Sequence, residues 1–213
     1  VKVSAALIAT MVAIVLGMLV SSAKSTFDEM NSGLTEMGAK VIQLDQTLAH
    51  YGPETKDIRD SLRGTVVSVI RTVWPEDVDS HPDLAAIEKS SAGAKMLIAI
   101  RKLQPQTDDQ RELKSQALQI SSDLTNLRWT MIERLHKSLP RMVLLVLASW
   151  LAILFTSFGL FASRNATVVM ALCLSALSVS GAVLLIMELN DPLSGMIKAS
   201  ADPFYKALEF IGK

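Results

Sequence analysis

Three stretches of the chain carry no charged residue: residues 3–20, 142–162 and 166–187. They are 18, 21 and 22 residues long. A helix that rises 1.5 Å per residue needs roughly 20 apolar residues to cross the hydrocarbon core of a bilayer. Three residues, 163–165, separate the second stretch from the third. The sequence therefore predicts an all-α membrane protein with three spans, the last two forming a tight antiparallel hairpin. Because the sequence begins at Val1, we also expect a further span upstream.

The first span continues directly into a heptad pattern. Apolar residues recur in alternating steps of three and four, which is typical of a coiled-coil-like stalk. We expect the stalk to end at the sequence Tyr51-Gly52-Pro53-Glu54, because glycine closes helices and proline begins them. These four residues are a candidate structural corner. The stalk residues are Val20, Ala23, Phe27, Met30, Leu34, Met37, Val41, Leu44 and Leu48.

Three more helices are expected before the second span. The first covers 53–74, with Ile58, Leu62, Val66, Val69 and Val73 on its apolar face, and the second covers 83–103 and is weakened near 90–93. Thr107 and Gln110 form a capping-box pattern that begins the third. Together they predict an antiparallel bundle.

The expected organisation has four parts: a membrane helix at 1–20, a helical bundle at 21–140, a membrane hairpin at 141–189 and an amphipathic segment at 190–213. In that last segment, Asp191-Pro192 and Asp202-Pro203 each resemble a helix start. Lys and Arg gather beside the bundle ends of the spans, which places the bundle and the C-terminus in the cytoplasm. We expect the bacterial inner (plasma) membrane.

Composition excludes several classes of function. The 21 Lys and Arg residues balance the 21 Asp and Glu residues, so the basic excess typical of nucleic-acid binding is missing. The three histidines, His50, His81 and His136, lie in separate segments and do not have the spacing of a metal site. No nucleophile motif or dinucleotide fingerprint is present. We expect neither an enzyme nor a cofactor.

Small and hydroxyl residues recur along the third span and suggest a surface that faces another subunit or a pore. Ser175 and Ser178 are candidate pore-lining residues, although packing within one chain explains the pattern equally. Glu188 and Asp191 at one end of that span are candidate pore-mouth or gating residues, with an ion pair between Glu188 and Arg134, Lys137 or Arg141 as the plainer interpretation.

Two blocks of residues resemble the bestrophin-like domain family of bacterial integral membrane proteins. The resemblance implies a homo-oligomeric membrane protein and, through the bestrophins, a pentameric anion channel with a central pore. Phe155 and Phe158 would then supply an aromatic constriction, and Arg164 and Asn165 would attract an anion at the outer turn. An Arg-Phe-Pro motif of the bestrophin kind is not in the sequence. The first block contains Leu44-Asp45, His50 to Glu54, Arg59-Asp60 and Leu62-Arg63; the second contains Phe158 to Phe161, Arg164 to Thr167, Ala176 to Ser178, Gly181, Glu188 to Pro192 and Ser194-Gly195.

Two hypotheses follow. The first is a homo-oligomeric channel in a lipid bilayer that conducts small inorganic ions, with anions as the favoured class. The second is a non-conducting scaffold or signalling protein that uses the heptad stalk for oligomerisation.

Overall fold

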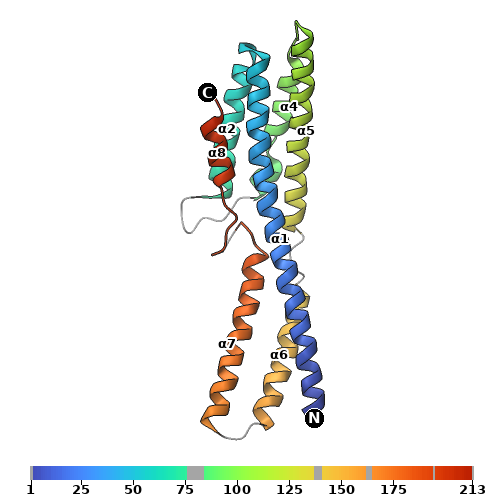
Figure 1. Cartoon of the computed structure of the whole chain (residues 1–213), viewed down its shortest axis with the longest axis vertical. Helices are drawn as coiled ribbons and strands as arrows, with labels where there is room; N and C mark the ends of the chain where they lie inside the picture. Colours follow the sequence, from blue (N-terminus) through green and yellow to red (C-terminus); the bar gives the residue numbers. More distant parts are fainter. Residues whose placement is uncertain (1, 76–83, 137–140, 162–164, 194, 213) are drawn as a thin grey trace. The chain divides into compact units, whose positions relative to one another are not determined.

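The computed structural model describes residues 2–75, 84–136, 141–161, 165–193 and 195–212. Every regular element in these ranges is a helix, which confirms the all-α fold class (Figure 1). The helices are α1 (Lys2–Tyr51), the 3₁₀ helix η1 (Pro53–Thr55), α2 (Lys56–Val73), α3 (Leu84–Lys89), α4 (Ala92–Lys102), α5 (Asp108–His136), α6 (Arg141–Phe161), α7 (Ala166–Leu189) and α8 (Asp202–Phe210).

The chain divides into two compact units. The membrane unit comprises Val1–Asp28 and Lys137–Ile197, and the bundle unit comprises Glu29–His136 and Lys198–Lys213. α1 contributes its first part to the membrane unit and its second part to the bundle unit.

The membrane unit contains the apolar helices. Among the described residues, three helices are long and apolar enough to cross a membrane: the α1 segment Ala6–Tyr51, Met142–Leu160 of α6, and α7. Its small core consists of Val12 from α1 with Leu147 and Leu154 from α6. Most other apolar side chains of these helices are exposed within the chain, as expected for helices surrounded by lipid or by other subunits.

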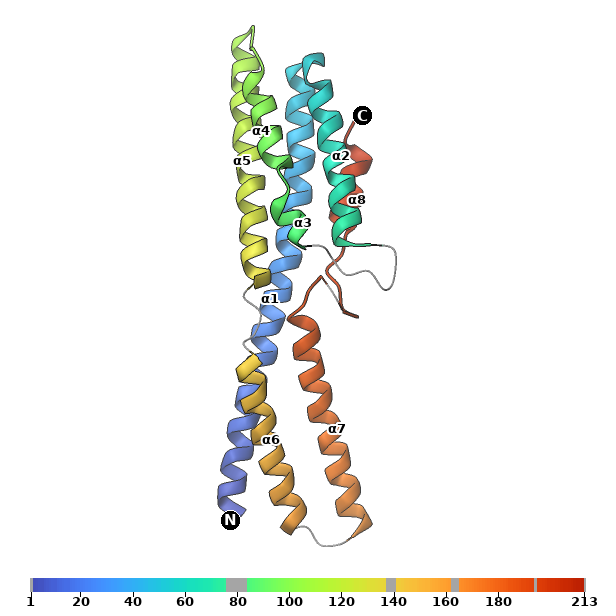
Figure 2. The same cartoon turned by 180° about the vertical axis from the view of Figure 1, so that it is seen from behind.

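The bundle unit confirms the predicted seam of α1. The seam residues Met30, Leu34, Val41, Leu44 and Leu48 are all buried. They face the helices of their own chain, with α2 and α8 beside α1 in Figure 1 and α3 and α4 beside it in Figure 2.

The predicted apolar face of α2 needs one correction. Ile70 is buried and Val69 is half-buried, whereas the expected face contained Val69 and omitted Ile70. The two residues lie about 100° apart around the helix. The positions of the neighbouring helices decide which of them is covered.

The helix boundaries follow the predicted signals with small shifts. Gly52, at φ 137°, ends α1, and a short 3₁₀ turn precedes α2. The predicted helix at 83–103 is two helices, α3 and α4, separated at Ser90 and Ser91. The backbone nitrogen of Gln110 donates to Thr107 Oγ1 at 3.1 Å, which confirms half of the capping box. The Gln110 side chain accepts instead from the Gln106 nitrogen at 2.8 Å.

The C-terminal segment contains another correction. No helix begins at Pro192: residues 192–193 form a turn and residues 195–201 form bends and irregular backbone, so the predicted helix start at Asp191-Pro192 is wrong. α8 does begin at Asp202 and packs in the bundle unit. Trp74 donates from Nε1 to the Ala199 carbonyl at 2.8 Å, and its ring lies 5.7 Å from that of Phe204.

Candidate functional site

The candidate residues on α7 lie on a surface that the rest of the chain leaves exposed. Ala171, Ser175 and Ser178 are all exposed. The Ser175 hydroxyl donates to the Ala171 carbonyl at 2.9 Å, so it is satisfied within its own helix. A side-chain carbon added at Gly181 would meet nothing within 4 Å. This small-residue face of α7 (Ala171, Ser175, Ser178) is free to contact lipid or a second subunit.

A second surface of this kind lies on α1. Ala13, Gly17 and Ser21 are exposed, and a carbon added at Gly17 would also meet nothing within 4 Å. The small residues Ala13, Gly17 and Ser21 of α1, like those of the small-residue face of α7, are therefore exposed in the chain itself, where they would permit close approach of another helix.

A groove of about 570 Å³ separates α6 from α7 in the membrane unit. Phe155 lines this groove with Ser180 and Val183, while Glu188 lies at one end of the same set. Ser175, Ser178 and Phe158 are not among its lining residues, and the Phe158 side chain is 42% exposed. The four predicted pore-lining residues therefore do not share one surface within a single chain.

Glu188 holds the loop that follows α7. Its Oε2 accepts hydrogen bonds from the backbone nitrogens of Met196 at 2.7 Å and Ile197 at 3.4 Å. Two N–H donors offset the unfavourable placement of an acid at a helix C-terminus. Gly195, at φ 89°, allows the loop to turn back, and a side chain there would collide with the Glu188 carboxylate.

The ion pair expected for Glu188 has a different outcome in the described residues. Arg134 pairs with Glu29, with 3.4 Å between Nη1 and Oε2. Lys137 and the side chain of Arg141 lie outside the described residues. The contacts observed for Glu188 are thus to backbone nitrogens.

The other predicted pore-mouth residues are only partly described. Arg164 lies outside the described residues. Asn165 precedes α7 in an extended conformation, and its carbonyl accepts from Val168 at 3.0 Å and from Val169 at 3.1 Å. Asp191 is exposed, and its nitrogen donates to the Glu188 carbonyl at 3.3 Å. Asn165 therefore begins α7 through its backbone.

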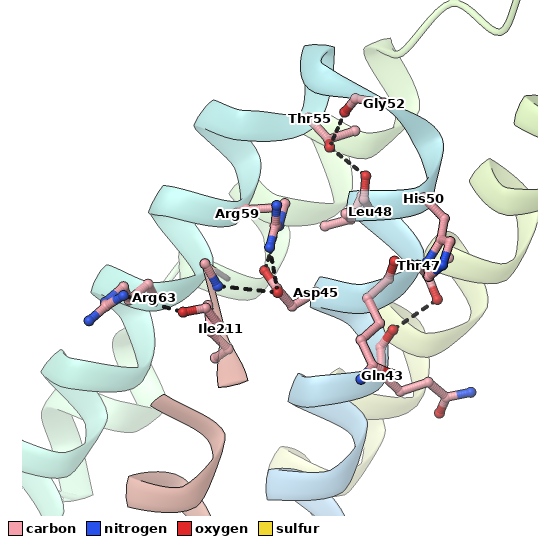
Figure 3. A network of polar contacts seen from close by, with 12 residues as sticks. Gln43, Asp45, Thr47, Leu48, His50, Gly52, Thr55, Arg59, Arg63 and Ile211 are labelled. Carbon is pink, nitrogen blue, oxygen red and sulfur yellow. Dashed lines mark hydrogen bonds and ion pairs between the residues drawn. The ribbon is translucent and has the colours of Figure 1, made fainter. Parts of the chain in front are cut away.

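The predicted corner is tightly bonded. Thr55 is buried, and its hydroxyl lies 2.5 Å from the Leu48 carbonyl and 2.8 Å from the Gly52 carbonyl (Figure 3). Gln110 Nε2 donates to the Tyr51 carbonyl at 3.0 Å. Pro53 begins the 3₁₀ turn that also contains Glu54. The corner joins α1, α2 and α5, which is a structural role.

Below the corner, an ion pair connects α1 to α2. Arg59 donates from Nε and Nη2 to the two carboxylate oxygens of Asp45, each at 2.8 Å (Figure 3). The hydrogen bond to Asp45 raises the pKa of the Arg59 guanidinium. Arg63 donates to the Ile211 carbonyl at 3.2 Å, so the same face of α2 also binds the end of the chain.

The comparison with protein families is decisive for classification. A family model described as the Bestrophin-like domain matches residues 1–204. The chain belongs to the bestrophin-like domain family. This confirms the resemblance inferred from the sequence blocks.

Solved structures show the same fold for this bestrophin-like protein. Two crystal structures of a bacterial bestrophin homologue from Klebsiella pneumoniae are similar to it, each of a variant with one apolar residue changed to threonine. The first has a TM-score of 0.73 at 18% identity and covers 99% of this chain and 88% of that one. The second has a TM-score of 0.68 at 18% identity and covers 98% and 83%. No curated protein matches the sequence.

Sequence reasoning missed two polar contacts of the bestrophin-like chain. Asp45 and Arg59 belong to the first block of residues that resembles the family, and the sequence pattern assigns neither of them a partner. Asp45 lies beside Leu44 on the buried side of α1, and a carboxylate on an apolar face signals a buried partner. Trp74, whose Nε1 donates to the Ala199 carbonyl, is the last residue of the helix predicted at 53–74. Nothing near it in the sequence indicates its partner.

Proposed function

We propose that this bestrophin-like protein forms a homo-oligomeric ion channel in the bacterial inner membrane. Its pore would be lined by the small-residue face of α7, with Ser175 and Ser178 offering hydroxyl oxygens and Phe155 and Phe158 narrowing the passage. The bundle at 21–140 and the segment at 190–213 would lie in the cytoplasm, as the distribution of Lys and Arg favours.

The observation that carries the proposal is the exposure of the small-residue face. Ala171, Ser175 and Ser178 are all exposed within their own chain. Small side chains give little apolar area to lipid, and they permit close helix contact. Family membership supports the same conclusion, since bestrophin homologues are known as oligomeric ion channels.

The choice of ion rests on the two ends of α7. Arg164 and Asn165 at the outer turn would attract an anion, and Glu188 and Asp191 at the other end would repel one. The hydrogen bonds from Met196 and Ile197 offset part of the Glu188 charge. This favours anions, with Asp191 as the acid that opposes them.

The alternative scaffold hypothesis required the α1 seam for oligomerisation. Met30, Leu34, Val41, Leu44 and Leu48 are buried within the chain. A covered seam cannot also bind a second copy without opening the bundle, so this observation counts against oligomerisation through these seam residues.

The first experiment measures subunit number by native mass spectrometry of the full chain in lipid nanodiscs, followed by halide flux in liposomes. A closed ring of four or more subunits with halide flux is expected. A monomer or dimer, or a ring without flux, would overturn the proposal.

A matched pair of variants tests the pore face. Ser178→Trp should reduce flux strongly by filling the pore. Leu177→Trp, at a 71% exposed neighbour on α7, should leave flux nearly unchanged. Equal flux in the two variants would remove Ser178 from the pore.

A further inference from the structure

A partly open cavity of about 220 Å³ lies within the bundle unit. Helices α1 to α5 and α8 line it, and Figures 1 and 2 show their arrangement from opposite sides. Apolar side chains such as Val69, Met96 and Phe204 form much of its wall. Thr65, Ser121 and Thr125, which carry hydroxyl groups, also line the cavity, so its wall is mixed rather than uniformly apolar.

Arg128 is the charged residue among those lining the cavity. Its Nη1 donates to the Ser90 carbonyl at 2.9 Å, and its Cζ lies 5.1 Å from the centre of the Trp129 ring. Its Nε is buried and has no hydrogen-bond partner among the described residues. Of the five N–H donors of this guanidinium, one is bonded to the Ser90 carbonyl and the buried Nε–H is unsatisfied within the described residues.

Some other half-buried cations of the bundle unit have carboxylate partners, whereas Lys114 donates to the carbonyls of Arg101 at 2.8 Å and Leu103 at 2.7 Å. Lys40 binds Asp123 at 2.8 Å, and Arg59 binds Asp45 at 2.8 Å. Within the described chain, Arg128 has no such partner. A partly buried charge without a counter-charge is costly, which makes the cavity receptive to an anion.

The start of α4 adds to this preference. Ala92 and Gly93, its first two residues, line the cavity; Ser91 makes no side-chain cap, and the Ala92 nitrogen donates to Ser90 Oγ at 3.4 Å. No acidic residue lies in the first turn of α4. The backbone N–H groups at a helix start favour a negative charge, in the same direction as Arg128.

We infer that this cavity binds a small monocarboxylate with an apolar body, with the carboxylate at Arg128 and the body against Val69, Met96 and Phe204. Arginine suits this ligand because its planar N–H groups match the two carboxylate oxygens. A cavity of about 150 Å³ holds a benzene ring, so 220 Å³ has room for a ring and a carboxylate. The inference is independent of whether the protein conducts ions.

Benzoate is a suitable probe, with benzylamine as the cation of matched shape. Calorimetric titration of the full chain in nanodiscs, with empty nanodiscs subtracted, should show saturable binding of one benzoate per chain. Benzylamine should show no saturable binding. Absent benzoate binding would mean a cavity filled by water only, and equal binding of both compounds would mean a site that does not select the carboxylate; either result would overturn the inference.

Variants locate the binding site. Arg128→Met keeps an unbranched apolar side chain and should weaken benzoate binding about tenfold or more, as expected for loss of a charge-assisted hydrogen bond. Arg101→Met, at an exposed arginine near the end of α4, should bind benzoate normally. Equal affinities in these two variants would contradict the assignment.

A separate measurement covers the case in which Arg128→Met does not fold. Val69→Phe should fill the cavity and abolish benzoate binding with Arg128 unchanged. In the unmodified protein, benzoate should shift the NMR signal of the Arg128 Nε–H. Unchanged benzoate affinity in Val69→Phe, or an unshifted Nε–H signal at saturating benzoate, would overturn the inference.

Discussion

Arg59 on α2 donates hydrogen bonds of 2.8 Å to both carboxylate oxygens of Asp45 on α1 (Figure 3). The Asp45 side chain is 4% exposed and that of Arg59 is 19% exposed. The backbone nitrogen of Gly212 reaches Asp45 Oδ2 at 3.4 Å. A single buried carboxylate therefore joins α1, α2 and the end of the chain.

Removing one partner of this pair should be more harmful than removing both. Arg59→Met leaves a buried carboxylate without its cation, and we expect a loss of about 3–5 kcal/mol of unfolding free energy. Asp45→Leu combined with Arg59→Met should recover much of that loss, because no charge is then left buried. Chemical denaturation of the three proteins in the same detergent measures both effects.

An exposed ion pair gives the matched control. Arg111 pairs with Asp108 on the surface of α5, where their side chains are 67% and 92% exposed. Arg111→Met should change stability by less than about 1 kcal/mol. Losses of similar size in Arg59→Met and Arg111→Met would contradict the burial argument.

Two helical glycines should respond to alanine in opposite directions. A carbon added at Gly38 of α1 would lie 2.8 Å from the Pro203 carbonyl oxygen of α8, whereas one added at Gly64 of α2 would meet nothing within 4 Å. Gly38→Ala should therefore displace α8 and cost about 1–3 kcal/mol. Gly64→Ala should stabilise the helix by up to about 1 kcal/mol.

Thermal unfolding measures the stability of both glycine variants, and Trp74 fluorescence reports the displacement of α8. Trp74 contacts Phe204 of α8, so its emission should change in Gly38→Ala and stay constant in Gly64→Ala. If Gly38→Ala were as stable as the original protein, the close approach of α1 and α8 would be wrong.

The sequence predicts those features that depend on local pattern. Missing charge over about 20 residues identifies the spans, and the repeat from Met30 to Leu48 identifies the buried side of α1. Gly52 and Pro53 locate the corner because each has a backbone preference of its own. These predictions need no knowledge of distant residues.

Local sequence patterns do not predict contacts between residues that are distant in the sequence. Periodicity gives the buried face of a helix but not which neighbour covers it, as Ile70 shows by replacing Val69. For the same reason the sequence does not predict the contact of Arg128 with the Ser90 carbonyl, which is 38 residues away. The candidate pore residues stay predictions for a related reason, since a pore formed by several subunits depends on contacts between copies.

The Lys40–Asp123 pair predicts a pH effect. The hydrogen bond that Asp123 accepts from Lys40 is the main reason that the pKa of Asp123 lies below the ordinary value of 3.8. A carboxyl group whose pKa is lowered by folding adds to the free energy of unfolding when the pH is above its pKa in the unfolded chain. That stability is lost as the pH falls through the lower pKa of the folded protein. Asp123→Asn and Lys40→Met should each flatten the fall in unfolding temperature below about pH 4. A slope identical to that of the original protein in both variants would exclude this pair as the cause.

Glu188 allows its structural and electrostatic roles to be separated. Glu188→Gln keeps an oxygen that can accept from Met196 and Ile197 while removing the charge, so the loop should persist. Gly195→Ala keeps the charge but forces a side chain into the space of the Glu188 carboxylate, at a backbone angle that disfavours it, so the loop should be displaced. Hydrogen exchange at the Met196 amide should therefore accelerate in Gly195→Ala and change little in Glu188→Gln.

If Glu188 contributes to a pore mouth, halide selectivity in liposomes should shift in Glu188→Gln despite its intact loop. Selectivity unchanged in Glu188→Gln would restrict this residue to holding the loop.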